Sequence, residues 1–126
     1  MIILCLIFSC AAIALHIFIF YLESLAWEGE LARKTFKTPS VQAARDSKFF
    51  AFNQGFYNLF LAGIALAGVL LLLAGSRETG SALMLAGLGS MLGAALVLFI
   101  ASPPHRPAAI KQGSTPLLAL LFLALA

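Results

Sequence analysis

Charged residues are scarce in this chain of 126 amino acids, and their scarcity indicates its class. Lysine and arginine number 8 and aspartate and glutamate 5, so that 10% of the residues are charged while 62% are hydrophobic. In an ordinary soluble domain about a quarter are charged and about half are apolar. A soluble domain of this size could not bury so much apolar surface. The composition therefore excludes a soluble domain, a disordered chain and a disulfide scaffold, and predicts a single membrane domain over residues 1–126.

Cysteine and histidine occur twice each, and neither has the spacing of a metal site. Cys5 and Cys10 would lie about 140° apart on a helix, which does not suit a disulfide, so we expect two small buried side chains. The sequence also lacks a phosphate-binding loop and an activated nucleophile, and we predict no metal and no cofactor. The basic residues form no stripe interleaved with aromatic residues, which argues against nucleic-acid binding.

Lysine and arginine are absent before Arg33, so the first apolar stretch lacks the basic start of a signal peptide, and we expect it to be retained. A helix needs about 20 mostly apolar residues to cross a membrane. Such stretches cover approximately residues 2–27, 49–75, 81–102 and 110–126. The last reaches only about 25 Å as a helix, so a re-entrant or interfacial segment is its alternative. The sequence predicts an all-α integral membrane four-helix bundle with antiparallel spans.

Basic residues are distributed unequally among the predicted loops. Seven lie in the first and third loops, and the second loop carries only Arg77; the seven are Arg33, Lys34, Lys37, Arg45, Lys48, Arg106 and Lys111. The positive-inside rule makes the loop over residues 28–48 cytoplasmic and places both termini on the non-cytoplasmic side. We therefore expect a multi-pass protein of the cell inner (plasma) membrane, with membrane lipids around it and at the basic first loop.

Two local patterns concern helix starts and helix packing. Thr38-Pro39 is typical of an N-cap followed by proline at the first helical position, and this helix would run directly into the second span. Gly89-x-x-x-Gly93 in the third span lets another helix approach closely. We expect this pair to pack inside the bundle, with a homodimer through the Gly89/Gly93 face as the alternative.

Polar residues inside the predicted spans are the candidates for a site, because buried polar groups are costly in lipid. His16, Glu23 and Trp27 lie on one face of the first helix, and further polar residues begin the second and fourth spans. We expect a polar cavity in the cytoplasmic half of the bundle. His16 and Glu23 are the acid–base candidates; the ligand-binding candidates are Glu23, Trp27, Asn53, Gln54, Tyr57, Asn58 and Gln112.

Two of these segments carry a resemblance. Tyr21-Leu22-Glu23-Ser24-Leu25-Ala26-Trp27 and Asn53-Gln54-Gly55-Phe56-Tyr57-Asn58 are similar to motifs of the bacterial four-span membrane family catalogued as domain of unknown function 1304. Lys111-Gln112-Gly113-Ser114-Thr115-Pro116 resembles the start of that family's last span. The resemblance implies the four-span topology and the same choice of polar residues, His16 included. It implies no activity.

Three functions are compatible with these residues. The first is binding of a lipophilic ligand with a polar head, such as a lipid, a quinone or an isoprenoid, with acid–base chemistry on it as an enzymatic variant. The second is a structural or assembly subunit whose polar groups serve only helix packing. The third is a small proton-coupled transporter, which would need Glu23 nearer the middle of the membrane.

Overall fold

The structure is a computed structural model that describes residues 1–126, and it contains helices and no strands. The predicted all-α class is therefore confirmed. Four long helices carry most of the chain, and three short helical segments lie near their connections. The elements in chain order are α1 (Ile2–Phe20), the π-helix η1 (Tyr21–Leu25), α2 (Glu30–Thr35), α3 (Val41–Leu73), α4 (Arg77–Ala101), the 3₁₀-helix η2 (Pro103–His105) and α5 (Arg106–Ala124).

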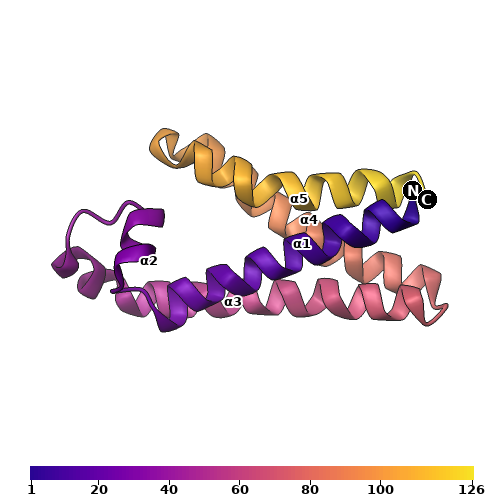
Figure 1. Cartoon of the computed structure of the whole chain (residues 1–126), viewed down its shortest axis with the longest axis horizontal. Coiled ribbons are helices and arrows are strands. Elements are labelled where there is room, and N and C mark those ends of the chain that lie inside the picture. The colour runs from indigo at the N-terminus through magenta and orange to yellow at the C-terminus, as the bar shows by residue number, and fades with distance from the viewer.

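The four long helices form a ring in which α1 packs on α3 and α5, and α4 packs on the same two helices. Figure 1 shows both termini at one end of this bundle, beside the turn between α3 and α4. At that end the Arg77 guanidinium donates a hydrogen bond of 2.7 Å to the carbonyl of Ala126. The opposite end carries α2 and the turn between α4 and α5. The two connections that are richest in basic residues therefore lie together.

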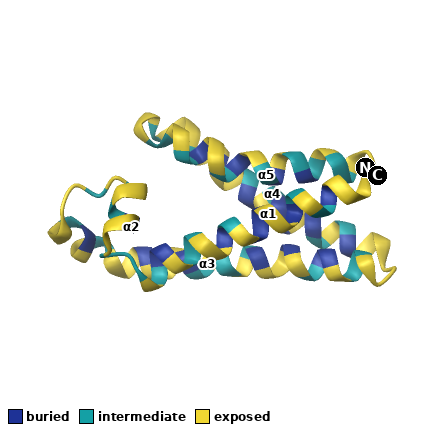
Figure 2. Cartoon of the chain, in the orientation of Figure 1, coloured by how far each residue is buried: buried dark blue, intermediate teal, exposed yellow.

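Exposed positions occur along all four long helices, and buried positions alternate with them (Figure 2). Many of the exposed side chains are large and apolar, whereas alanine and methionine are frequent among the buried ones. Phe49 and Ile100 each remain about three-quarters exposed, at 75% and 74%. Such faces are favourable in lipid and unfavourable in water. Three helical runs are long and apolar enough to cross a membrane: Ile2–Leu25, Val41–Leu73 and Arg77–Ala101. The chain is thus built as a helical membrane protein. Helix α5 is not among the three because its first half is polar, so the fourth span stays a prediction.

Glycines on α3 and α4 let these two helices approach closely. A Cβ on Gly68 would lie 2.6 Å from the backbone nitrogen of Met84, and one on Gly87 would lie 2.8 Å from that of Ala65. In contrast, a Cβ on Gly89 or Gly93 would meet nothing within 4 Å. The predicted packing of Gly89 and Gly93 inside the bundle is therefore wrong. Gly89 follows Gly87 by two residues, which turns it about 200° round the helix, away from α3.

Several boundaries differ from the predicted ones. The first helical run ends at Leu25 rather than 27. Helix α3 passes without a break from the basic loop residues into the second span, as predicted, but it begins at Val41 rather than at Pro39. Ser40, not Thr38, caps α3: its Oγ accepts a hydrogen bond of 3.1 Å from Ala43 N. Helices α4 and α5 begin at Arg77 and Arg106, four residues before each predicted span, because a helix continues into polar residues that a hydropathy pattern excludes.

The two cysteines have different surroundings. Cys5 is buried at the core, whereas Cys10 is exposed, and both are free thiols. The absence of a disulfide follows from their positions on one helix. The expectation that both side chains are buried holds for Cys5 and is wrong for Cys10, which faces outward because the two residues point in different directions round α1.

Candidate functional site

The end of the first helix widens into the π-helix η1 and crosses α3 at Gly55. A Cβ on Gly55 would overlap Ser24 Oγ and would lie 3.0 Å from the backbone nitrogen of Ser24, so a larger residue fits there only if η1 and α3 shift apart. Ser24 Oγ donates a hydrogen bond of 2.8 Å to the carbonyl of Phe52. Single-turn π segments inside helices are frequent at functional sites. Here the wider turn and the close crossing together hold Glu23 on the inside of the bundle.

Glu23 is the one acidic side chain buried in the bundle, with 4% of its surface exposed. Asn58 on α3 donates a hydrogen bond of 2.8 Å from Nδ2 to Glu23 Oε2. The same amide nitrogen lies 3.3 Å from the carbonyl of Gln54, one turn earlier on α3. Glu23 Oε1 receives no hydrogen bond from the protein. One carboxyl oxygen is thus fixed to α3 while the other is free for another partner.

A cavity of about 370 Å³ opens beside this carboxyl group. Residues of α1, η1, α3, α4 and α5, and of the connections that precede α3 and α5, line it. Its polar or aromatic lining consists of Glu23, Trp27, Phe36, Gln54, Tyr57, Asn58, His105 and Gln112, and its aliphatic lining of Ile19, Leu61, Ala94, Leu98 and Ala108. The cavity is therefore polar around Glu23 and apolar on the walls that α4 supplies.

A larger groove of about 560 Å³ lies elsewhere, on the outside of α1, α3 and α4. Only apolar side chains and glycine line it, with Ile17, Phe60 and Leu83 among them. Such a groove offers no group that could orient a ligand, and acyl chains of the surrounding lipid would fill it. The smaller cavity beside Glu23 is the better candidate because polar groups converge there.

Trp27 joins the segment after η1 to the start of α3. Its indole Nε1 donates hydrogen bonds to the carbonyl of Ala44, at 3.0 Å, and to Ser47 Oγ, at 3.1 Å. Its ring lies against that of Phe36, with ring centroids 5.2 Å apart. Trp27 and Phe36 together form an aromatic wall at the end of the cavity, and the two hydrogen bonds of the indole hold this wall in place.

His105 also lines the cavity, although its position in a proline-rich turn outside the predicted spans gave no sign of this. Its Nδ1 lies 2.6 Å from Ser102 Oγ, and its Nε2 lies 3.1 Å from the carbonyl of Phe36. A carbonyl only accepts, so the proton of this bond is on Nε2. Lys37 Nζ donates a second hydrogen bond between the same segments, of 2.7 Å, to the carbonyl of Pro104. The long first connection is thereby tied to the turn between α4 and α5.

Most of the predicted ligand-binding residues come together in the cavity, and two predicted residues do not. Glu23, Trp27, Gln54, Tyr57, Asn58 and Gln112 line it, whereas Asn53 is exposed and outside it. Asn53 precedes Asn58 by five residues, which turns it about 140° round α3. His16 is fully buried deeper in the bundle, where its Nδ1 bonds to the carbonyl of Ala12 at 2.9 Å and its Nε2 has no partner. It does not face Glu23 across the cavity.

The charges around the cavity are sparse. Glu23 is its only acid, and no group of three metal-ligating side chains occurs in the chain. Glu28, just beyond η1, is hydrogen-bonded to Lys48 at 2.9 Å and to Arg45 at 3.2 Å. The hydrogen bond from Lys48, helped by the charge of both cations, holds the pKa of Glu28 below its ordinary value. Glu28 therefore stays ionised and anchors the start of α3.

Comparison with known proteins identifies the family of this chain. The family described as Protein of unknown function (DUF1304) matches residues 10–124. This range includes η1, the crossing at Gly55 and every residue that lines the cavity. No curated protein and no solved structure matches the chain. Because the match covers nearly the whole length, the chain belongs to the DUF1304 family of proteins of unknown function.

Proposed function

We propose that this protein binds a lipophilic molecule with a polar head, of the class of a lipid, a quinone or an isoprenoid, in the cavity beside Glu23. One observation carries the proposal: a buried carboxyl group with one oxygen fixed by Asn58 and the other free, at the edge of a cavity of about 370 Å³. Because Glu23 lines the cavity and its Oε1 makes no hydrogen bond to the protein, this oxygen is available to a hydroxyl or amine group of a ligand.

The lining supports a ligand that is polar at one end and apolar at the other. Gln54, Asn58 and Gln112 offer amide donors and acceptors near Glu23, while Leu61 and Leu98 offer an apolar wall. Small-molecule sites are commonly of this kind, mostly apolar with a few convergent polar groups. The aromatic wall of Trp27 and Phe36, together with Tyr57, would cover a ring or a cationic group. A ligand from the membrane could therefore place its head at Glu23.

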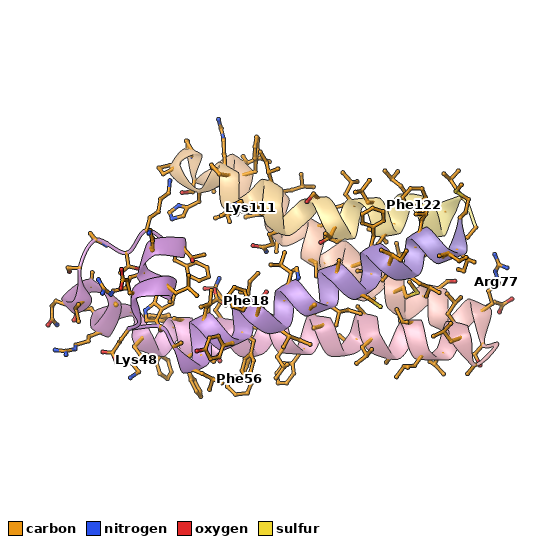
Figure 3. All side chains as sticks on the ribbon, in the orientation of Figure 1. Phe18, Lys48, Phe56, Arg77, Lys111 and Phe122 are labelled. Atoms are coloured by element: carbon orange, nitrogen blue, oxygen red, sulfur yellow. The ribbon has the colours of Figure 1, made fainter.

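The site belongs, in this proposal, to the cytoplasmic half of an inner-membrane protein with four spans and outward-facing termini. Figure 3 shows Lys48 and Lys111 at the end of the molecule that carries α2, and Arg77 at the end that carries the termini. That asymmetry supports the orientation by the positive-inside rule. Cysteine substitutions at Lys111 and Arg77, in a chain whose exposed Cys10 is replaced by alanine and in cells labelled with an impermeant maleimide, test it. We expect label on Arg77→Cys and none on Lys111→Cys. The opposite result would show that the protein has the opposite orientation in the membrane.

Binding is proposed ahead of acid–base catalysis because the predicted pair of acid and base is not assembled. His16 does not line the cavity, and its Nδ1 is bonded to the backbone of its own helix. The histidine that does line the cavity, His105, has both ring nitrogens within hydrogen-bond distance of protein atoms. Glu23 is the only carboxyl group of the cavity, and its Oε1 is free to bond to a ligand.

A structural role is the second candidate, and one observation favours it. The bonds Asn58–Glu23, Ser24–Phe52 and Trp27–Ala44 each join η1 or the segment after it to α3 without a ligand. If these polar groups serve packing alone, Glu23→Gln should be silent in every measurement except stability, because glutamine keeps the shape and can still accept from Asn58.

The test is mass spectrometry of the molecules that co-purify with the detergent-solubilised protein. The wild type is compared with Glu23→Gln and with the matched control Glu30→Gln, which removes an exposed acid from α2 at the same end. We expect one small molecule to be enriched near stoichiometrically in the wild type and the control and to be lost from Glu23→Gln. Equal amounts of bulk lipid in all three would contradict the proposal and favour the structural role. Trp27, the only tryptophan, gives an independent fluorescence signal for occupancy.

A further inference from the structure

A second hollow, of about 260 Å³, lies outside the cavity at the end of the bundle that carries α2. Three lysines line it, two from α2 and the segment after it and one from the first turns of α5: Lys34, Lys37 and Lys111. Thr35 and His105 complete the polar lining. No acidic side chain is present in the hollow. Residues that are more than sixty positions apart thus bring three positive charges to one place.

The three lysines have no counter-charge elsewhere in the protein. Both ion pairs of the chain involve Glu28, with Arg45 and with Lys48. Lys37 Nζ uses one of its three donors on the carbonyl of Pro104, and neither Lys34 nor Lys111 makes a side-chain hydrogen bond. Unbalanced like charges around a hollow repel one another and attract an anion. The free donors therefore converge on a position where a negatively charged group would be stabilised.

The hollow is held in shape by bonds that do not involve a ligand. Lys37 has a φ of 54°, in the left-handed region that residues other than glycine rarely adopt. This conformation turns the chain after α2, where Lys37 reaches Pro104. The bond from His105 to the carbonyl of Phe36 fixes the same two segments a second time. The two segments that bring the lysines together are therefore held in place before any ligand arrives.

We propose that this hollow, the lysine cleft of Lys34, Lys37 and Lys111, binds a phosphate monoester, either the headgroup of a membrane lipid or a free phosphorylated compound. A phosphate monoester carries about 1.5 to 2 negative charges at neutral pH and has three strong acceptor oxygens. Lysine binds such a group as a compact point charge with several donors. Basic pockets of this kind at the cytoplasmic ends of helices bind lipid headgroups.

The lysine cleft is next to the cavity, since His105 and Ala108 line both. A lipid phosphate in the cleft would bring its apolar part to the mouth of the bundle. The phosphate site does not use Glu23, however, and it stands independently of the ligand proposed for the cavity. Glu23→Gln should accordingly leave phosphate binding unchanged, which separates the failure of one proposal from the failure of the other.

The experiment is native mass spectrometry of the detergent-solubilised full chain with phosphatidic acid and, in parallel, phosphatidylcholine of the same acyl chains. The test variant is Lys34→Gln/Lys37→Gln/Lys111→Gln. The control, Arg33→Gln/Arg45→Gln/Lys48→Gln, removes three charges from the same end outside the cleft. Retention of phosphatidic acid by the wild type and the control is expected, with a loss of affinity of about a hundredfold in the test variant. Lys111→Gln alone, at an exposed position with no bond to lose, repeats the test if the triple variant does not fold.

One further arm completes the test. Excess inorganic phosphate distinguishes the sources: displacement of phosphatidic acid indicates a site that accepts free phosphate compounds, and retention indicates one that also needs the lipid chains. Both results support the site. Equal binding of phosphatidylcholine and phosphatidic acid by the wild type would overturn the proposal. Equal losses in the two triple variants would also overturn it, because general attraction to positive charge would then account for the binding.

Discussion

Asn58 Nδ2 donates a hydrogen bond of 2.8 Å to Glu23 Oε2, and this bond joins the π-helical end of the first helix to α3. The two residues are 35 positions apart. Only 4% of the surface of Glu23 is exposed, so bulk water has little access to this bond. The bond therefore has two consequences: it stabilises the crossing of η1 and α3, and it leaves a single carboxyl oxygen for a ligand.

Asn58→Leu is expected to destabilise the protein by about 1 to 3 kcal/mol, because it leaves a buried carboxyl group without its partner. The measurement is reversible unfolding in detergent. Asn53→Leu is the matched control, since Asn53 is on the same helix, is exposed and makes no side-chain hydrogen bond. Its substitution should change the free energy of unfolding little. Equal effects of the two substitutions would mean that the bond between Asn58 and Glu23 contributes nothing specific.

Gly55→Ala is expected to disrupt the site more than its single added methyl group suggests. That methyl carbon would overlap Ser24 Oγ, which donates to the carbonyl of Phe52, and it would lie 3.0 Å from Ser24 N, a backbone atom that cannot turn aside as a side chain does. Overpacking of this kind costs about 1 to 3 kcal/mol. Gly63→Ala, on the same helix, meets nothing within 4 Å and should be neutral or slightly stabilising, because alanine favours helix over glycine. Thermal unfolding of both variants tests this, and a neutral Gly55→Ala would contradict it.

His105→Leu is expected to loosen the first connection from the turn before α5. The substitution removes the bond to the carbonyl of Phe36, worth about 1 kcal/mol, so local opening should increase about fivefold. Limited trypsin digestion, followed by mass spectrometry, would show this as faster cleavage after Lys34 and Lys37. Arg77→Gln, at the other end, should leave those rates unchanged. Unaltered cleavage in His105→Leu would show that the remaining bond from Lys37 to Pro104 is sufficient.

The helical class and most of the polar lining could be predicted from the sequence, for a physical reason. Exposure of a polar side chain to lipid costs free energy, so a polar residue in a long apolar run is expected to face inward. This argument predicts inward positions for Glu23, Asn58 and Gln112. Their spacing along each helix then gave the face on which they lie. Asn53 shows the limit of that argument. Periodicity groups the polar residues on one broad side of α3, but it does not say which part of that side faces η1, and Asn53 lies outside that part.

The rest of the site depends on contacts that periodicity does not encode. His105 reaches the carbonyl of Phe36 across 69 positions, and both are in irregular connections without a repeating pattern. The close approach at Gly55 is likewise set by the crossing of two helices. The spacing of Gly89 and Gly93 predicted that a helix packs on their face of α4, yet α3 packs on the face that carries Gly87 instead. A small residue permits a close contact, but the partner helix decides which of several small residues is used.

Acid should weaken the anchor at the start of α3 through Glu28. The bond from Lys48 holds the pKa of Glu28 below its ordinary value, so the folded state binds that proton less readily than the unfolded chain. The stabilisation is complete above the ordinary pKa of glutamate, about 4.3, and is lost as the pH falls through the lower pKa of the folded state. The effect should be small, because the ion pair is on the surface and is screened by salt. The measurement is a pH titration of ¹³C-labelled glutamate by NMR, in the wild type and in Lys48→Gln. The titration of Glu28 should move to higher pH in the variant; an unchanged midpoint would show that Arg45 alone holds the carboxylate ionised.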